Sequence, residues 1–217
     1  MSDLRPAPGL PTRAQTEVRR SRFITLLARA GSEDEARDVV AAARAEFPDA
    51  RHHCSAFLVA VPGANLLERS SDDGEPAGTA GTPMLEVLRG SGLTDVVAVV
   101  VRYFGGTKLG TGGLVRAYSA AVQAVLERVP RVRAVRLGLW TLDLPHADAG
   151  RVEAELRSRG IDVATPTYSA AGVRLTLATK DEAELRGAVS LVTSGTADPE
   201  PAGETVVELP VSSAPAP

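Results

Sequence analysis

The sequence predicts an α+β protein of two domains. A chain of 217 residues is long enough to form two small hydrophobic cores. The run VVAVVV at 96–101 is typical of a strand that is covered on both faces or lies centrally in its sheet. Residues 131–210 follow the order strand, helix, strand, strand, helix, strand, which is that of a ferredoxin-like domain. Pro130 ends the helix before them, so we place the domain boundary there.

The first domain is expected over residues 16–130, where apolar residues recur with strand and helix periods. Ser32, with Glu35 three residues later, forms a capping-box pattern that predicts the start of a helix. Thr82 and Pro83 are typical of an N-cap followed by the first helical residue. The predicted elements are a strand over 18–27, a helix over 32–46, a strand over 52–61, a helix over 82–88, a strand over 96–101 and a helix over 114–129.

The second domain is expected over residues 131–210. Its predicted elements are a strand over 132–144, a helix over 147–159, a strand over 161–168, a strand over 173–179, a helix over 181–192 and a strand over 204–209. No motif in this domain carries recognisable chemistry. The segments 1–15 and 211–217 are rich in proline and polar residues, and we expect them to be disordered tails because they bury too little apolar surface.

Composition and charge exclude several classes of function. The formal net charge is -3 and neither half of the chain is basic, which argues against dedicated sequence-specific DNA binding. Cys54 is the single cysteine, so an internal disulfide and a multi-cysteine zinc site are excluded. The N-terminus has no apolar signal region, and no run reaches the ~20 apolar residues of a membrane span. We therefore expect a cytoplasmic protein with no membrane partner.

A glycine-rich loop after the strand at 96–101 is the strongest candidate site. A P-loop requires Ser or Thr after its lysine, whereas Lys108 is followed by Leu109. Backbone amides ahead of a helix N-terminus still favour an anion, to which Arg102 and Arg116 would add positive charge. We therefore expect a phosphate-sized ligand or an RNA backbone. The residues expected to contact it are Arg102, Gly105, Gly106, Lys108, Gly110, Gly112, Gly113 and Arg116.

An acidic turn, formed by Asp72, Asp73, Gly74 and Glu75, precedes this loop in the chain. One interpretation is structural, with the arginines of the loop paired to these carboxylates in a polar network. Carboxylates also suit Mg²⁺ or Ca²⁺, but the EF-hand spacing is absent and a turn at Asp73 and Gly74 is the simpler explanation. A third interpretation is that the turn is the docking point of a protein partner. We predict no metal and no cofactor.

Signals for catalysis are weak. His52 and Cys54 lie on one face of their predicted strand, as a cysteine nucleophile and its activating histidine would. A buried free cysteine is the commoner case. The sequence contains no paired catalytic carboxylates and no HExxH or GxSxG motif, so we predict no catalytic residue. Tyr103 and Phe104 either stack on a ligand or pack into the core.

The acidic turn and the glycine-rich loop also resemble the signature of a known family. DDGEPAGTAGTPM at 72–84 and VVVRYFGGTKLGTGGLVRAY at 99–118 look like the IMPACT/YigZ proteins, and SRFI at 21–24 and ARHHCSAF at 50–57 support the likeness. The resemblance is strong over the first domain. Over the second domain it rests on the order of helices and strands more than on sequence motifs. One departure, Ala77 where the family often has serine, touches none of the expected contact residues.

This resemblance implies a first domain like the second domain of ribosomal protein S5 and a ferredoxin-like second domain similar to one in elongation factor G. The eukaryotic IMPACT protein is a translational regulator. The expected function is therefore that of a non-enzymatic regulator of translation or of a stress response, acting through RNA, the ribosome or a translation-associated protein. The alternative is an enzyme that binds a nucleotide or a phosphorylated small molecule with the same loop.

Overall fold

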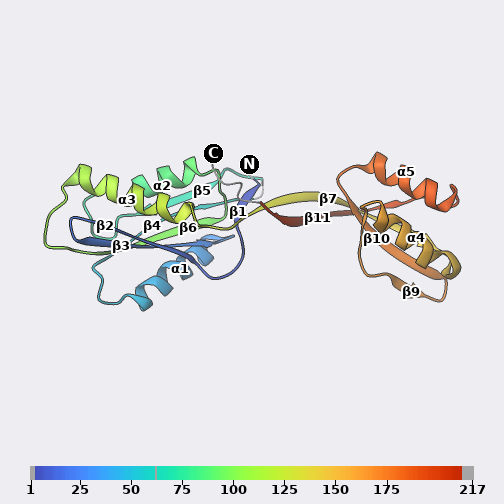
Figure 1. Ribbon diagram of the computed structural model, residues 1–217, viewed down its shortest axis with the longest axis horizontal. Coiled ribbons are helices and arrows are strands. Elements are labelled where there is room, and N and C mark those ends of the chain that lie inside the picture. The colour runs from blue at the N-terminus through green and yellow to red at the C-terminus, as the bar shows by residue number, and fades with distance from the viewer. Residues whose placement is uncertain (1–2, 62, 212–217) are drawn as a thin grey trace. The chain divides into compact units, whose positions relative to one another are not determined.

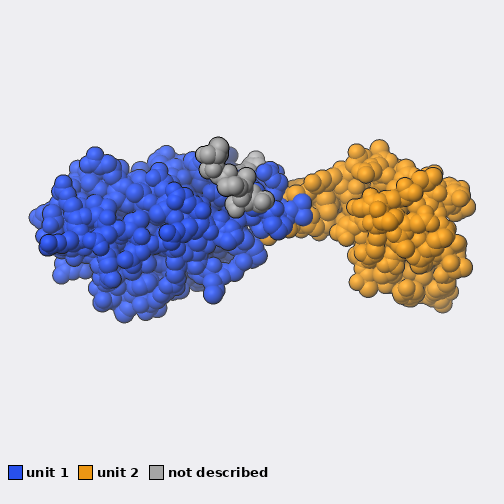
Figure 2. Space-filling model, viewed as in Figure 1, with its two compact units in different colours: residues 1–133, 209–217 blue, residues 134–208 orange. Residues whose placement is uncertain are grey.

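Two compact units make up the chain in this computed structural model, which describes residues 3–61 and 63–211. One unit comprises Met1–Arg133 with Leu209–Pro217, and the other comprises Ala134–Glu208 (Figure 2). The helix predicted to end at Pro130 ends earlier, at Leu126, and the division between the units falls after Arg133, inside a continuous strand. Of the predicted C-terminal tail, residue 211 donates its amide to the Arg131 carbonyl at 2.9 Å, and residues 212–217 lie outside the described residues.

Helices are interspersed with single strands and short runs of strands along the described residues (Figure 1). Up to residue 130 the elements are β1 Leu4–Pro6, β2 Thr12–Val18, β3 Ser21–Arg29, α1 Glu33–Glu46, β4 His52–Val59, β5 Leu67–Ser71, α2 Gly81–Gly90, β6 Val96–Tyr103 and α3 Thr111–Leu126. From residue 131 they are β7 Arg131–Leu144, α4 His146–Ser158, β8 Asp162–Val163, β9 Thr167–Ser169, β10 Gly172–Thr179, α5 Glu182–Thr193 and β11 Glu200–Pro210.

The first unit is built on an antiparallel sheet in the order β2-β3-β6-β4-β5. Strand β6 lies at its centre, as its continuous run of β-branched residues predicts. Val97, Val99 and Val101 pack with α1 in one core, whereas Val96 and Val100 pack with α2 and α3 in another. Figure 1 shows α1 on one face of this sheet and α2 and α3 on the other. Because helices cover both faces of the sheet, β6 is apolar at nearly every position.

The helix starts differ in how they are capped. Ser32 caps α1, because its side chain accepts the Glu35 amide at 3.1 Å, as the capping-box pattern predicts. The predicted N-cap Thr82 is wrong, since α2 begins one residue earlier at Gly81 and its N-cap Ala80 has no capping side chain. The physical reason is that a carboxylate from the acidic turn supplies the cap instead, as described below.

The prediction of a disordered tail over residues 1–15 is wrong for the described part of that segment. Strand β1 pairs with β7, with Leu4 opposite Arg133, and β2 pairs with β3 along its whole length. Polar and proline-rich composition therefore does not prevent order here, because strand pairing satisfies the backbone whatever the side chains are. Ala14 of β2 is buried in the core of the first unit. Strand β5, at the edge of the sheet, was also not predicted.

The second unit is built on a sheet in which β7 pairs with β10 and β10 pairs with β8, while β11 also pairs with β7 and β9 with β10. Helices α4 and α5 pack on it through a separate apolar core that includes Leu142, Leu156 and Leu185. The single strand predicted over 161–168 is interrupted between β8 and β9. Pro166 lies in this interruption, and proline cannot donate a ladder hydrogen bond.

Candidate functional site

Asp72, the first carboxylate of the acidic turn, caps helix α2 from outside the helix. Its two oxygens accept the backbone amides of Gly78 at 2.8 Å, Ala80 at 3.0 Å and Gly81 at 2.8 Å. Burial alone would raise the pKa of Asp72, but these three hydrogen bonds outweigh it and lower the pKa. A carboxylate at a helix N-terminus also interacts favourably with the helix dipole. Asp72 is therefore occupied inside the protein.

Asp73 ties the acidic turn to two neighbouring elements. One of its oxygens accepts from Arg44 of α1 at 2.6 Å, and the other accepts the His53 amide of β4 at 2.6 Å. The Asp73 carbonyl lies 2.9 Å from His52 Nδ1. Positive φ angles of 41° at Asp73 and 84° at Gly74 give the left-handed turn that the sequence predicts.

Glu75 and Arg102 form a buried ion pair at the end of the sheet. Their side chains are only 4% and 7% exposed, and Arg102 Nη1 lies 2.6 Å from Glu75 Oε1. Tyr118 of α3 donates its hydroxyl to the same oxygen at 2.8 Å. For Arg102 the structure therefore realises the polar-network interpretation. Tyr118 was missed by sequence reasoning because its helical spacing indicated only a core position.

Cys54 lies beneath this network and is fully buried. Its sulfur is 3.3 Å from the Tyr118 hydroxyl and 3.0 Å from the Asp72 carbonyl. Burial, the dominant cause, raises the pKa of the Cys54 thiol to about 12. Burial also raises the pKa of Tyr118, with further contributions from Cys54 and Glu75. A thiol held protonated in this way is not an activated nucleophile.

The glycine-rich loop runs from the end of β6 to the start of α3, and its glycines serve different purposes. A Cβ on Gly105 would lie 2.1 Å from the backbone carbon of Arg20, so the hairpin between β2 and β3 leaves no room for a side chain. Gly105 also donates its amide to Ser21 Oγ at 3.1 Å. Gly106 and Gly110 have φ of 86° and 72°, which favour glycine. The backbone that approaches Gly105 is therefore the chain's own.

Helix α3 begins within the predicted loop and has a free N-terminus. Gly110 is its N-cap and makes no capping hydrogen bond through a side chain. Thr111, Gly112 and Gly113 form the first turn, and within residues 3–61 and 63–211 their amides have no hydrogen-bond acceptor. No steric contact explains glycine at position 112, where a Cβ would meet open space. These amides are available to an anion.

Several cations of the loop, of α3 and of the hairpin that contacts Gly105 are exposed. Lys108 in the loop and Arg116 on α3 are exposed, and neither forms an ion pair with any described residue. The same holds for Arg19 and Arg20 in the hairpin that Gly105 contacts. Sequence reasoning missed these two arginines because only the folded sheet brings the hairpin to the loop. We call Arg19, Arg20, Lys108, Arg116 and the first turn of α3 the glycine-loop surface.

A pocket of about 340 Å³ opens beside this surface. Its lining residues are Glu75, Pro76, Arg102, Phe104, Lys108, Leu109, Gly110, Thr111 and Leu114. The buried ion pair therefore borders the same hollow as Lys108 and the start of α3. Two residues that the sequence singles out on separate motifs, Glu75 and Lys108, meet at one site.

The two aromatic residues at the end of β6, Tyr103 and Phe104, have different environments. Tyr103 donates its hydroxyl to Asp49 at 2.8 Å, and the guanidinium of Arg22 lies 4.7 Å from its ring centroid. Phe104 is 56% exposed, and the guanidinium of Arg102 lies 5.8 Å from its ring centroid. Tyr103 is thus fixed within the protein, whereas Phe104 presents an aromatic surface at the pocket.

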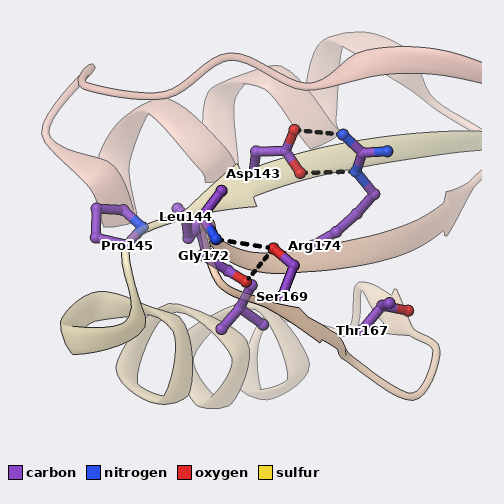
Figure 3. Close-up of a pocket in the computed structure, with 9 residues that line it drawn as sticks. Asp143, Leu144, Pro145, Thr167, Ser169, Gly172 and Arg174 are labelled. Carbon is purple, nitrogen blue, oxygen red and sulfur yellow. Dashed lines mark hydrogen bonds and ion pairs between the residues drawn. The ribbon is translucent and has the colours of Figure 1, made fainter.

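A second pocket, of about 540 Å³, lies in the other unit between the ends of β7 and β10. Asp143 and Arg174 form a two-point ion pair there at 2.7 and 2.6 Å (Figure 3). Ser169 donates its hydroxyl to the Gly172 carbonyl at 3.0 Å. Sequence analysis did not predict this pocket. Its charged side chains neutralise each other, so it offers no obvious preference for a charged ligand.

Two further kinds of feature are absent from the described residues. Within the described ranges, no group of three or more His, Cys, Asp or Glu residues is placed to hold a metal ion. Across the same residues, no helix combines the length and apolar character needed to cross a membrane.

Comparisons with known proteins agree on one family. A model of the Impact N-terminal domain matches residues 19–126. IMPACT family member YigZ of Escherichia coli is 46% identical over 149 residues, which cover 69% of this chain and 73% of the relative. An IMPACT family member of Haemophilus influenzae is 42% identical over 156 residues, covering 72% of this chain and 76% of the relative.

A solved structure supports the same relationship over nearly the whole chain. The crystal structure of a hypothetical protein is 39% identical, covers 92% of this chain and 96% of its own, and superposes with a TM-score of 0.59. The sequence identity, the matched domain and the shared architecture together lead to one conclusion: the chain belongs to the IMPACT family.

Proposed function

We propose that this protein is a non-enzymatic regulator of translation or of a stress response, and that it binds RNA, free or within the ribosome, through the glycine-loop surface. One observation carries the proposal. The carboxylates of the acidic turn are all engaged inside the protein, whereas Lys108 and Arg116 remain exposed and unpaired among the described residues, beside the free amides of α3. Such an arrangement favours a phosphate group.

The fold of each unit supports this proposal by analogy. We infer that the first unit is like the second domain of ribosomal protein S5 and that the second is ferredoxin-like. For the second unit the support is the order of elements, which is βαββαβ once β8 and β9 count as one interrupted strand. The strand pairings of β7 with β10 and β11, and of β10 with β8, add to it. Fold alone does not fix function, so the site carries the argument.

The second candidate function is an enzyme or sensor that binds a nucleotide or a phosphorylated small molecule. The observation that favours it is the pocket of about 340 Å³, whose volume falls within the roughly 300–1,000 Å³ of small-molecule sites. A thermal-shift screen with nucleotides tests it, because a ligand at ~100 times its Kd stabilises a protein by about 2.7 kcal/mol. No shift with any nucleotide would remove the support for this alternative.

Co-sedimentation with ribosomes at low and high salt tests the RNA-binding proposal. The test variant carries Lys108→Ala and Arg116→Ala. Arg102 is left intact, because its removal would leave the buried Glu75 carboxylate without its partner. The matched control carries Arg69→Ala and Arg128→Ala, which removes two exposed cations that lie away from the loop.

We expect the wild type and the control to bind ribosomes with an affinity that falls as salt rises. The test variant should bind more weakly and with a shallower salt dependence, because each lost phosphate contact removes nearly one unit from the slope of log affinity against log salt. Equal binding by the test variant and the wild type would exclude the glycine-loop surface. Absence of ribosome and RNA binding in the wild type would exclude the proposed function.

A further inference from the structure

We propose that the pocket beside the glycine-loop surface is a seat for one nucleotide, with its base against Phe104 and its phosphate on the first turn of α3. This inference rests on the proposed function, since it identifies the part of an RNA that the surface would recognise. The same chemistry is offered by a nucleotide within a single strand and by a free nucleotide.

The walls of the pocket suit a planar, apolar-faced group. Phe104, more than half exposed, forms one side, and Pro76, Leu109 and Leu114 supply further apolar surface. Exposed aromatic side chains are the usual platforms for unstacked bases, because every base has a π-face. The geometry therefore favours a base over an aliphatic ligand.

The polar groups of the pocket suit the edge of a base. Glu75 Oε1 accepts from Arg102 and Tyr118, but Oε2 has no hydrogen-bond donor among the described residues. Arg102 is more than nine-tenths buried, and its Nε has no partner among those residues either. Both side chains line the apolar hollow, where Glu75 Oε2 is without a donor and the Arg102 Nε is covered. Carboxylates and guanidinium groups are common partners of base edges.

The rim of the pocket suits a phosphate. Lys108 and Thr111 both line it, and the amides of the first turn of α3 are free. Helix α3 extends over 16 residues, long enough for its N-terminus to carry a substantial partial positive charge. A nucleotide presents a base and a phosphate together, so one ligand satisfies both the apolar hollow and the cationic rim.

Two pairs of variants test the base and the phosphate separately. Phe104→Ala removes the aromatic face, and Phe104→Tyr keeps it. Thr111→Glu places a negative charge at the rim, and Thr111→Gln is its neutral counterpart. Phe104 and Thr111 are both exposed, and a glutamate at a helix start is favourable for folding, so all four variants should fold. Urea unfolding verifies this for each.

The probes are a mixed-sequence single-stranded RNA hexamer, measured by fluorescence anisotropy, and the four nucleoside 5′-monophosphates, measured by calorimetry. We expect Phe104→Ala to weaken RNA binding about fivefold or more, since that is the lower range for loss of a stacked base. Thr111→Glu should weaken it by a similar factor. Phe104→Tyr and Thr111→Gln should bind within about twofold of wild type, as neither removes the stacking face nor adds charge.

The outcomes separate this inference from the proposed function. RNA binding that is unchanged in Phe104→Ala and Thr111→Glu overturns the nucleotide seat. The proposed function then still stands if the variant with Lys108→Ala and Arg116→Ala binds ribosomes more weakly than the wild type. Monophosphate binding that depends on Phe104 and Thr111, with no RNA or ribosome binding, supports the seat with a free nucleotide as its source and overturns the proposed function. Absence of binding to either probe overturns the seat.

Discussion

The acidic turn and the glycine-rich loop lie at the same end of the first unit, yet their charges do opposite things. The three carboxylates of the turn face inward, where they cap α2, join α1 to β4 and neutralise Arg102. Lys108 and Arg116 of the loop and helix face outward and pair with none of the described residues. Adjacent polar motifs can therefore divide their roles, one building the fold while the other leaves its cations exposed.

The largest effect on stability is expected when the buried carboxylate of Glu75 is removed. Glu75→Ala should lower the free energy of unfolding by about 3–5 kcal/mol, because Arg102 would remain buried without its partner. Urea denaturation measures the loss, and Glu127→Ala, at an exposed position after α3, serves as the control. The double variant Glu75→Leu with Arg102→Met should be less destabilised than Glu75→Ala. A loss below about 1 kcal/mol would mean that the turn is not structural.

Two substitutions distinguish the structural roles of Gly105 and Gly112 within the loop itself. Gly105→Ala should destabilise the protein by about 1–3 kcal/mol, because its Cβ would overlap the Arg20 backbone. Gly112→Ala should instead stabilise it by about 0.5–1 kcal/mol, since position 112 is helical and a Cβ there meets nothing. Thermal unfolding of both variants distinguishes them by sign. Equal effects would contradict the distinct roles assigned to these glycines.

The cap that Asp72 provides should give a smaller, pH-dependent effect. Asp72→Asn should cost about 1 kcal/mol at pH 7, the usual scale of an N-cap. Its folded pKa is lowered, so the stabilisation is complete above the unfolded value of about 3.9 and is lost as pH falls through the folded pKa. Unfolding measured from pH 7 to pH 3 should show the difference between wild type and variant shrinking. A constant difference would show that the charge contributes nothing.

The smallest expected effect on stability belongs to the exposed cations. Lys108→Ala and Arg116→Ala should each change the free energy of unfolding by less than about 0.5 kcal/mol, as is usual for surface positions without partners. Chemical denaturation under the conditions used for Glu75→Ala makes the two regions directly comparable. Destabilisation of more than about 1 kcal/mol would assign these cations to the fold and not to a ligand.

Local patterns predicted the elements better than the contacts between them. The β-branched run of β6 and the capping box of α1 were readable because each depends on residues close in sequence. The cap on α2 was not, since Asp72 lies eight positions before Ala80 and acts through a turn. Pairing between β1 and β7 joins residues more than a hundred positions apart, which no local signal reports.

The same distinction explains the candidate site. Glycines ahead of a helix predicted an anion site, which stays a prediction, and the structure places the free amides of α3 in that segment. Arg102 was expected to touch the ligand's phosphate, but it is paired with Glu75 because β6 ends beside the acidic turn. Arg19 and Arg20 were overlooked, since only sheet pairing between β3 and β6 brings their hairpin to the loop. Charge alone could not tell which cations would remain exposed.

The contact between Gly105 and the backbone of Arg20 has a thermodynamic consequence. Because no side chain fits between them, the hairpin and the loop hold each other in place before any ligand arrives. Backbone ordering is a major cost when flexible segments bind, and here folding has already met that cost. The same contact therefore predicts that the glycine-loop surface would change little in shape on binding the ligand proposed for it.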